Sequence, residues 1–197
     1  MQTVLNQFCA KNDVREYMMR PLRREGFIYA TNGYVAIRVP DDANLDADSH
    51  DKMNNLPSAF NIDFDEYVLS PIPALPEMPL CKACRGARVL YREACPSCDG
   101  NGSFDRHGHY YDCKECDTRG TVEADSVEAN KVTCDSCAGT GANGEQAILI
   151  GASTYQLSLV SMMSALPNCL IKMPHSENES LHFRFDGGVG ILLSRRD

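Results

Sequence analysis

The sequence lacks the long apolar segments that would place the protein in or across a membrane. Among its 197 residues, no apolar run approaches the roughly 18 residues that a membrane-spanning helix needs. The first residues, MQTVLNQFCAKND, lack the basic-then-apolar order of a signal peptide. These two absences predict a cytoplasmic location. Structural disulfides are rare there, so cysteines indicate metal or redox chemistry.

Motifs of common catalytic sites are also missing. The chain contains no G-x-S-x-G nucleophile turn, no G-x-x-x-x-G-K-[ST] phosphate loop and no H-E-x-x-H metal-binding helix. His50, His175 and His182 stand alone in the sequence. We therefore predict that the protein is not an enzyme.

Positive charge is scarce. The chain has 19 Lys and Arg against 27 Asp and Glu, for a net charge of −8. This balance argues against a surface that grips nucleic acid or an anionic membrane throughout. It predicts a protein partner and no membrane, disfavours DNA, and leaves the oligomeric state open. The candidate basic patch is Arg15, Arg20, Arg23 and Arg24.

Negative charge is concentrated in residues 41–80, which contain nine acidic residues and one basic residue. The aspartates between positions 41 and 51 lack the spacing and the glycine of an EF-hand loop. The stretch is therefore predicted to be a solvated loop and not a calcium site.

Cysteine, in contrast, is abundant. Eight of the ten cysteines form four C-x-x-C pairs within 57 residues. One tight turn aims both sulfurs of such a pair at one point, and two turns supply the four thiolates of a closed structural zinc site. The pattern therefore predicts two structural zinc ions. The eight candidate ligands are Cys81, Cys84, Cys95, Cys98, Cys113, Cys116, Cys134 and Cys137.

Two other chemistries use the same residue type. Iron–sulfur clusters also bind thiolates, but the spacing here does not match a compact ferredoxin run. A thiol oxidoreductase usually has its dithiol at a strand-to-helix junction of a βαβ unit, and no such unit is evident. The remaining cysteines, Cys9 and Cys169, lie in apolar surroundings and are predicted to be core residues.

The segment 81–141 resembles the cysteine-rich zinc domain of DnaJ-type co-chaperones, which contains four C-x-x-C-x-G-x-G repeats. The second and fourth repeats, CPSCDGNG and CDSCAGTG, match fully, whereas Arg88 and Thr118 replace glycines in the first and third. The resemblance implies that the outer pairs share one zinc (Cys81, Cys84, Cys134 and Cys137) and the inner pairs the other (Cys95, Cys98, Cys113 and Cys116). Spacing alone leaves pairing between neighbouring repeats open.

The resemblance does not extend beyond this module. The chain contains no His-Pro-Asp tripeptide and no J-type helical region. It is therefore not expected to be a complete co-chaperone that triggers ATP hydrolysis in a partner. A module that binds extended peptides remains an alternative.

A hairpin is predicted between the second and third cysteine pairs, at residues 103–111 with its turn near Gly108. His107 and His109 are expected to be exposed turn residues, because eight thiolates already complete two sites. The aromatic residues Phe104, Tyr110 and Tyr111 form either a recognition patch or a cover over the zinc sites.

The sequence before the cysteines predicts a helix followed by three strands. Val4, Leu5, Phe8 and Cys9 form the apolar stripe of a short helix. Strands are expected at 16–24, 27–31 and 34–39, with a turn at Asn32-Gly33 between the last two. The proline-rich stretch 71–79 is predicted to be a stiff, extended lead into the zinc module.

The sequence after the cysteines repeats this order. A short strand is expected at 147–151, followed by a helix from a Thr154 cap to about Ala165, which Pro167 ends. Strands are then expected at 169–173, 181–185 and 189–193. Residues 1–80 and 142–197 thus form two halves of one α+β domain, and 81–141 is inserted between them.

The doubled helix-plus-three-strand plan resembles one domain of a bacterial or phage sliding clamp. The similarity lies in Asp13-Val14-Arg15-Glu16-Tyr17, Gly26 to Tyr34 and Phe183 to Leu193. It implies a phage or prophage protein, located in the host cytoplasm. Known rings need six domain equivalents and basic helices, whereas here the only basic residue on either helix is Lys11. We therefore expect a non-catalytic accessory factor that acts through protein contacts on replication or recombination machinery, or on a host factor.

Overall fold

The computed structural model describes residues 1–11, 13–49, 55–124, 130–137 and 139–196. The chain divides into two compact units. Unit 1 comprises Met1–Glu77 and Glu145–Asp197, and unit 2 comprises Met78–Gly144, whose ends lie three residues outside the predicted 81–141 module on either side. None of the helices in the described part of the chain is long and apolar enough to cross a lipid bilayer.

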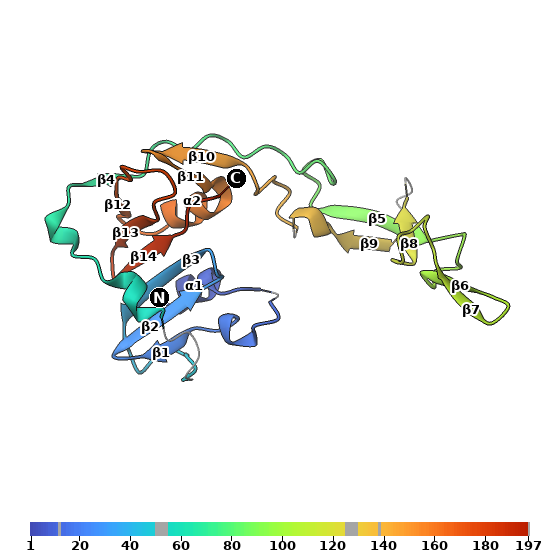
Figure 1. Cartoon of the computed structure of the whole chain (residues 1–197), viewed down its shortest axis with the longest axis horizontal. Helices are drawn as coiled ribbons and strands as arrows, with labels where there is room; N and C mark the ends of the chain where they lie inside the picture. Colours follow the sequence, from blue (N-terminus) through green and yellow to red (C-terminus); the bar gives the residue numbers. More distant parts are fainter. Residues whose placement is uncertain (12, 50–54, 125–129, 138, 197) are drawn as a thin grey trace. The chain divides into compact units, whose positions relative to one another are not determined.

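Unit 1 contains a seven-stranded sheet that both of its chain segments build, in the order β1-β2-β3-β14-β13-β12-β4 (Figure 1). All neighbouring strands of this sheet are antiparallel. The central pairing is between β3 and β14, where Val35 lies opposite Leu192 and Arg38 opposite Val189. The strands are β1 (Leu22–Arg24), β2 (Phe27–Thr31), β3 (Val35–Pro40), β4 (Leu69–Pro71), β12 (Leu170–Lys172), β13 (Leu181–Phe185) and β14 (Gly188–Leu192).

The two helices of unit 1 pack on one face of this sheet. Helix α1 (Gln2–Phe8) and helix α2 (Leu157–Ser164) contribute buried side chains to a single core with residues from both halves of the sheet. Because neither helix-plus-strands half encloses this core, the two chain segments stabilise each other. The helix residues in this core are Leu5, Phe8, Leu159, Val160 and Met163.

The opposite face of the first half is covered by a short 3-10 helix, Pro57–Phe60. Phe60 packs there with Leu22, Tyr29 and Ala36 in a second, smaller core. Two further 3-10 turns in unit 1 are Glu16–Met18 and Phe64–Glu66.

Two predicted elements were wrong. The expected strand 16–24 is a 3-10 turn followed by the short strand β1. Pro21 directly precedes β1, and proline is commonly found at the start of a strand because it cannot donate a hydrogen bond within a sheet. Thr154 does not cap a helix. It lies in β11 (Ser153–Gln156), which forms a hairpin with β10 (Ala147–Ile150), and α2 starts only at Leu157.

Unit 2 consists of short strands and tight turns. Strand β5 lies between β8 and β9 in a three-stranded sheet, and β6 and β7 form a separate hairpin. Where the chain enters and leaves the unit, the two passing segments are bonded to each other: the Asn143 N–H donates to the Pro79 carbonyl at 2.7 Å, and Leu80 bridges to Ala142. The elements are β5 (Val89–Ala94), β6 (Ser103–Arg106), β7 (His109–Asp112), β8 (Thr121–Glu123), β9 (Asn130–Thr133) and a 3-10 turn at Asp135–Cys137.

Candidate metal centres in unit 2

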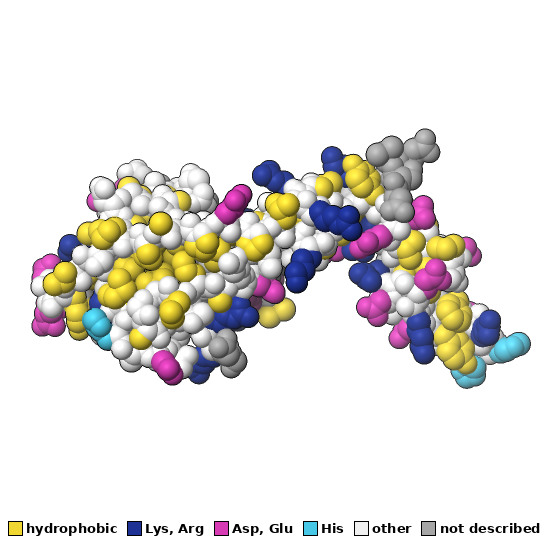
Figure 2. Space-filling view, turned by 90° about the horizontal axis from the view of Figure 1, so that it is seen from above, with side chains coloured by type: hydrophobic (Ala, Val, Ile, Leu, Met, Phe, Trp, Pro, Cys, Tyr) yellow, Lys and Arg dark blue, Asp and Glu magenta, His cyan; other side chains and the backbone are white. Residues whose placement is uncertain are grey.

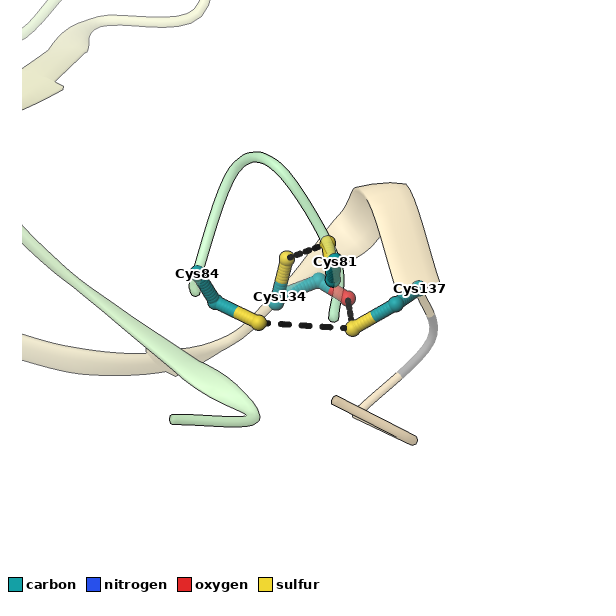
Figure 3. A group of neighbouring side chains, drawn as sticks. All are labelled: Cys81, Cys84, Cys134 and Cys137. Atoms are coloured by element: carbon teal, nitrogen blue, oxygen red, sulfur yellow. Dashed lines mark hydrogen bonds between the residues drawn. The ribbon is translucent and has the colours of Figure 1, made fainter. Parts of the chain in front are cut away.

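The eight C-x-x-C cysteines of unit 2 gather into two groups of four. The outer group joins the first repeat to the fourth, and its side chains converge on one point (Figure 3). Its sulfur atoms lie 3.9 Å apart between Cys81 and Cys134, and 3.6 Å apart between Cys84 and Cys137. This outer-with-outer grouping is the one that the DnaJ resemblance implies.

The inner group joins the second repeat to the third. Its sulfurs lie 3.8 Å apart between Cys95 and Cys113, and 3.7 Å apart between Cys98 and Cys116. In both groups, all four sulfurs lie within 4.8 Å of one another, so each group can hold a metal ion.

The sulfur separations test whether zinc fits. Four thiolates at about 2.3 Å from a tetrahedral zinc are separated from one another by about 3.8 Å. The measured separations of 3.6–3.9 Å between repeats agree with this edge length. A disulfide would need about 2.05 Å between sulfurs. The residues present therefore fit two zinc ions, each with a complete tetrahedral ligand set.

Reciprocal backbone hydrogen bonds bring the paired repeats together. In the outer group, the Cys81 N–H donates to the Gly141 carbonyl and the Cys134 N–H to the Arg88 carbonyl. The inner group repeats the arrangement with Cys95 to Gly120 and Cys113 to Gly102. Each site is therefore built by two repeats related by an approximate two-fold axis.

The glycines that end three of the repeats bring backbone N–H groups against the sulfurs. Gly102, Gly120 and Gly141 donate to Cys98, Cys116 and Cys137 at 3.2–3.3 Å. A Cβ at Gly120 would lie 2.2 Å from the Gly100 carbonyl oxygen, so this close approach of two turns requires glycine. These N–H groups stabilise negative charge on the thiolates.

The two positions where the sequence departs from the repeat adopt the same backbone conformation. Arg88 and Thr118 have φ values of +68° and +62°, in the left-handed region that favours glycine. The fold of the paired turns, and not the residue type, sets the backbone here. Both departures are therefore accommodated at some cost in conformational energy.

The thiols of each cluster have different pKa values because they lie close together. Burial tends to raise the pKa of Cys137, but the Gly141 N–H and the neighbouring thiols lower it to about 6. In the inner group, the Cys116 backbone N–H is the main cause that lowers the pKa of Cys113 to about 7, while burial raises that of Cys95 to about 12. One thiolate forms readily in each group, and its negative charge disfavours ionisation of the other three thiols. A divalent cation removes that repulsion, and its binding releases the remaining protons.

The sulfurs are enclosed. All eight ligand residues are at most 9% exposed. Among the described residues, the apolar side chains packed against the sulfurs are Leu90 at the outer group and Val122 at the inner group. A four-sulfur set without an open coordination position suits a structural role and gives water no place on the metal.

The remaining sequence candidates in unit 2 lie outside these clusters. His107 and His109 are exposed in the turn and second strand of the β6–β7 hairpin and belong to neither group. Phe104, Tyr110 and Tyr111 are also exposed, at 37, 82 and 49%, and none packs against the cysteines. The interpretation of these aromatics as a cover over the metal sites is therefore wrong.

The candidate basic patch of unit 1 is neutralised by ion pairs. Each arginine has a carboxylate within 3.3 Å, so the patch presents little excess positive charge. The pairs are Arg15–Asp13, Arg20–Asp46, Arg20–Asp48, Arg23–Asp41 and Arg24–Glu25.

The same ion pairs include three of the five aspartates between positions 41 and 51. Asp41, Asp46 and Asp48 bind arginines, and no acidic metal group involving them is found among the described residues. Asp51, part of the predicted solvated loop, lies outside the described residues.

The two cysteines of unit 1 lie in or against its apolar core. Cys9 is buried in the main core and Cys169 packs against it. Burial raises the pKa of Cys9 to about 11 and that of Cys169 to about 12, so both remain thiols at neutral pH.

Comparison with protein-family models, with curated proteins and with solved structures finds no significant match to this chain.

Proposed function

We propose that the protein is a non-catalytic zinc protein in which unit 2 is an interaction module held together by two structural zinc ions. The observation that carries this proposal is the pair of closed four-cysteine clusters. Such ligand sets contribute folding energy to small modules with little apolar core. Unit 2 fits this description, because the apolar side chains packed against its clusters are few.

We further propose that the protein acts through protein contacts, as a phage or prophage accessory factor of replication or recombination machinery or of a host factor. This step rests on the sequence resemblance between unit 1 and a single sliding-clamp domain. The topology is compatible with it: two helix-plus-strands halves meet at the β3–β14 pair, and both helices pack on one face. The ion-paired arginines and the net charge of −8 favour a protein partner over encirclement of DNA.

Metal analysis of the purified chain tests the first part. We expect two zinc ions per chain and eight thiols that react with a thiol reagent only after a chelator is added. A thiol oxidoreductase would instead show a reactive dithiol in the presence of zinc. That result, or a metal content well below two ions, would contradict the proposal.

Affinity capture tests the second part. The zinc-loaded chain and a variant lacking unit 2 serve as parallel baits in lysate of the host. A replication, recombination or host regulatory protein captured by the first bait alone supports an interaction module in unit 2. Capture of a broad set of unfolded polypeptides would favour the peptide-binding chaperone alternative.

A further inference from the structure

The β6–β7 hairpin of unit 2 has two faces of different chemistry. Neighbouring side chains along a strand point to opposite faces, and residues paired across the two strands share a face. One face carries the pairs Phe104–Tyr111 and Arg106–His109, and is called here the aromatic–basic face. The other carries the pairs Ser103–Asp112 and Asp105–Tyr110. The strand pairing thus places Arg106 and the stacked rings on one face, and Asp105 and Asp112 on the other, although both aspartates also border the hollow beside the rings.

The two rings of the aromatic–basic face stack on each other and form the aromatic platform of this face. The Phe104 and Tyr111 rings stack with their centroids 6.1 Å apart and their planes at 23°. The Arg106 guanidinium lies 6.0 Å from the Phe104 centroid. Phe104 is 37% and Tyr111 49% exposed, so part of each ring is accessible to a ligand.

A hollow of about 610 Å³ adjoins this platform. Phe104, Arg106, Tyr111 and Lys114 line it, so a second cation lies near the rings. Three carboxylates, Asp105, Asp112 and Glu115, also line the hollow. Two of them have partners within the protein. Glu115 accepts a hydrogen bond from Ser97, and Asp105 accepts one from the Gly108 N–H in the hairpin turn.

The space-filling view shows the same combination at the end of unit 2 that carries the hairpin. Hydrophobic side chains lie at the surface there, with Lys or Arg and His side chains beside them (Figure 2). The exposed rings do not pack against the inner cluster, because Val122 is the apolar residue packed against it in the described part of unit 2. Their exposure is therefore not explained by the fold of the module.

We propose that the aromatic–basic face binds single-stranded nucleic acid, with bases stacked on Phe104 and Tyr111 and phosphates beside Arg106 and Lys114. Exposed aromatic rings stack on bases of any sequence, and Lys or Arg neutralise the backbone. A duplex keeps its bases inside the stack, so the platform requires a single strand. This site goes beyond the protein contacts of the proposed function.

The charges of the face also determine how binding responds to salt. Two cations near the strand give a slope of log affinity against log salt of about −1.4, because each phosphate neutralised in a single strand contributes about −0.7. The carboxylates that line the hollow and the acidic residues elsewhere in the chain make binding weak at physiological salt. The interaction is therefore local and measurable at low salt.

Fluorescence anisotropy of a labelled oligothymidylate of about 12 nucleotides tests the proposal on the zinc-loaded full chain. We expect binding at low salt with the slope given above. Phe104→Leu and Tyr111→Leu keep an apolar side chain and remove the stacking ring, so each is expected to weaken binding about 5- to 100-fold. Arg106→Gln and Lys114→Gln should each weaken binding and make the slope shallower by about 0.7.

Tyr110→Leu is the matched control, because Tyr110 is the most exposed aromatic residue of the hairpin and lies on the opposite face. It should bind as the parent chain does. Every variant is checked for two zinc ions. If Phe104→Leu or Tyr111→Leu loses metal, the affinities and salt slopes of Arg106→Gln and Lys114→Gln decide whether the proposal holds. The proposal is overturned if no binding is seen, if binding ignores salt, or if Tyr110→Leu weakens it as much as Tyr111→Leu. It is also overturned if an acidic, aromatic-rich peptide binds this face and the oligonucleotide does not compete.

Discussion

At the scale of single residues, Thr118 occupies a backbone position suited to glycine. Its φ of +62° costs a side-chain-bearing residue about 1–2 kcal/mol, whereas glycine adopts it without strain. Thr118 is exposed, and its hydroxyl donates only to the neighbouring Asp117 carbonyl, so little packing is lost on its removal. After allowing for the larger backbone entropy of unfolded glycine, Thr118→Gly should stabilise the zinc-loaded unit by about 0.5–1 kcal/mol. Slower zinc transfer to a chromogenic chelator would show it.

Gly120→Ala is the opposite test at the same site. Its Cβ would lie 2.2 Å from the Gly100 carbonyl oxygen. That oxygen is a backbone atom, so no side-chain rotation can relieve the clash. We expect this variant to lose zinc from the inner site while the outer site keeps its metal.

Faster zinc release from Thr118→Gly than from the parent chain would refute the argument that Thr118 is strained.

Glu179 accepts more hydrogen bonds than any other carboxylate among the described residues of unit 1. It accepts from the Lys172 ammonium at 2.7 Å, from the His175 N–H at 2.9 Å and from the N–H and hydroxyl of Ser176. Lys172 is the main cause that lowers its pKa from 4.5 to about 2. A lowered pKa stabilises the folded state above pH 4.5, and the stabilisation is lost as the pH falls toward 2. Titration of the Glu179 carboxyl carbon by NMR should give that low pKa directly.

Lys172→Met keeps the aliphatic stem and removes the ammonium. The pKa of Glu179 should then rise toward its ordinary value. Glu179→Gln should lower the free energy of unfolding of unit 1 by about 1–3 kcal/mol at pH 7, because a charged acceptor is replaced by a neutral one. A Glu179 pKa near 4.5 in the parent chain would show that these bonds do not hold in solution.

At the scale of elements, the hairpins with strong local signals could be predicted from the sequence. The strands 27–31 and 181–185 have the predicted bounds. Gly26 and Asn32-Gly33 flank the first, and the second alternates apolar and polar residues before Asp186-Gly187. The strand 16–24 failed because Pro21 interrupts it, and the Thr154 cap failed because Ser153–Gln156 pairs with Ala147–Ile150. The edge strand Leu69–Pro71 was missed, because its pairing with β12 is long-range and leaves no periodic pattern in three residues.

The pairing of β13 with β14 contains a close fit between a glycine and an aromatic ring. Gly190 lies opposite Phe183, and a Cβ at Gly190 would lie 1.9 Å from the ring's Cζ. Phe183 is fully buried in the main core, so the ring has little room to move. Gly190→Ala should therefore destabilise unit 1 by about 1–3 kcal/mol, as overpacked cores usually do. Chemical denaturation followed by circular dichroism measures the change.

The double variant Gly190→Ala with Phe183→Leu separates overpacking from a backbone effect. If the clash with the ring is the cause, the second substitution should recover part of the loss and the two effects will not add. Simple additivity would point instead to the backbone at position 190.

At the scale of the whole molecule, the eight cysteine ligands could be read from their spacing in the sequence, whereas their grouping followed only from the DnaJ resemblance. Spacing along the chain is compatible with neighbour pairing, and the observed grouping depends on β5 lying between β8 and β9. Cys134, which directly follows β9, donates to the carbonyl of Arg88, which directly precedes β5. At the other end of β5, Cys95 donates to the carbonyl of Gly120, which directly precedes β8. The central strand thus connects the two sites, one at each end, through contacts that are distant in sequence.

The hydrogen bond between the segments that enter and leave unit 2 predicts that unit 1 folds without unit 2. Pro79 and Asn143 are joined by a 2.7 Å hydrogen bond, the arrangement of positions i and i+3 in a β-turn. Replacing residues 80–142 by two glycines should therefore close the chain without strain and leave a cooperatively folded unit 1. Its two segments still share one core, so unfolding should remain a single transition.

Zinc removal from the full chain makes the complementary prediction. A strong chelator should abolish the dispersed amide resonances of residues 78–144, because the cysteine clusters provide most of that unit's buried side chains. Resonances of unit 1 should stay in place, since its core includes none of the eight ligands. Lowering the pH should have the same selective effect, because protons compete with the metal for the thiolates. Loss of unit 1 resonances together with those of unit 2, under either treatment, would show that the two units depend on each other for folding.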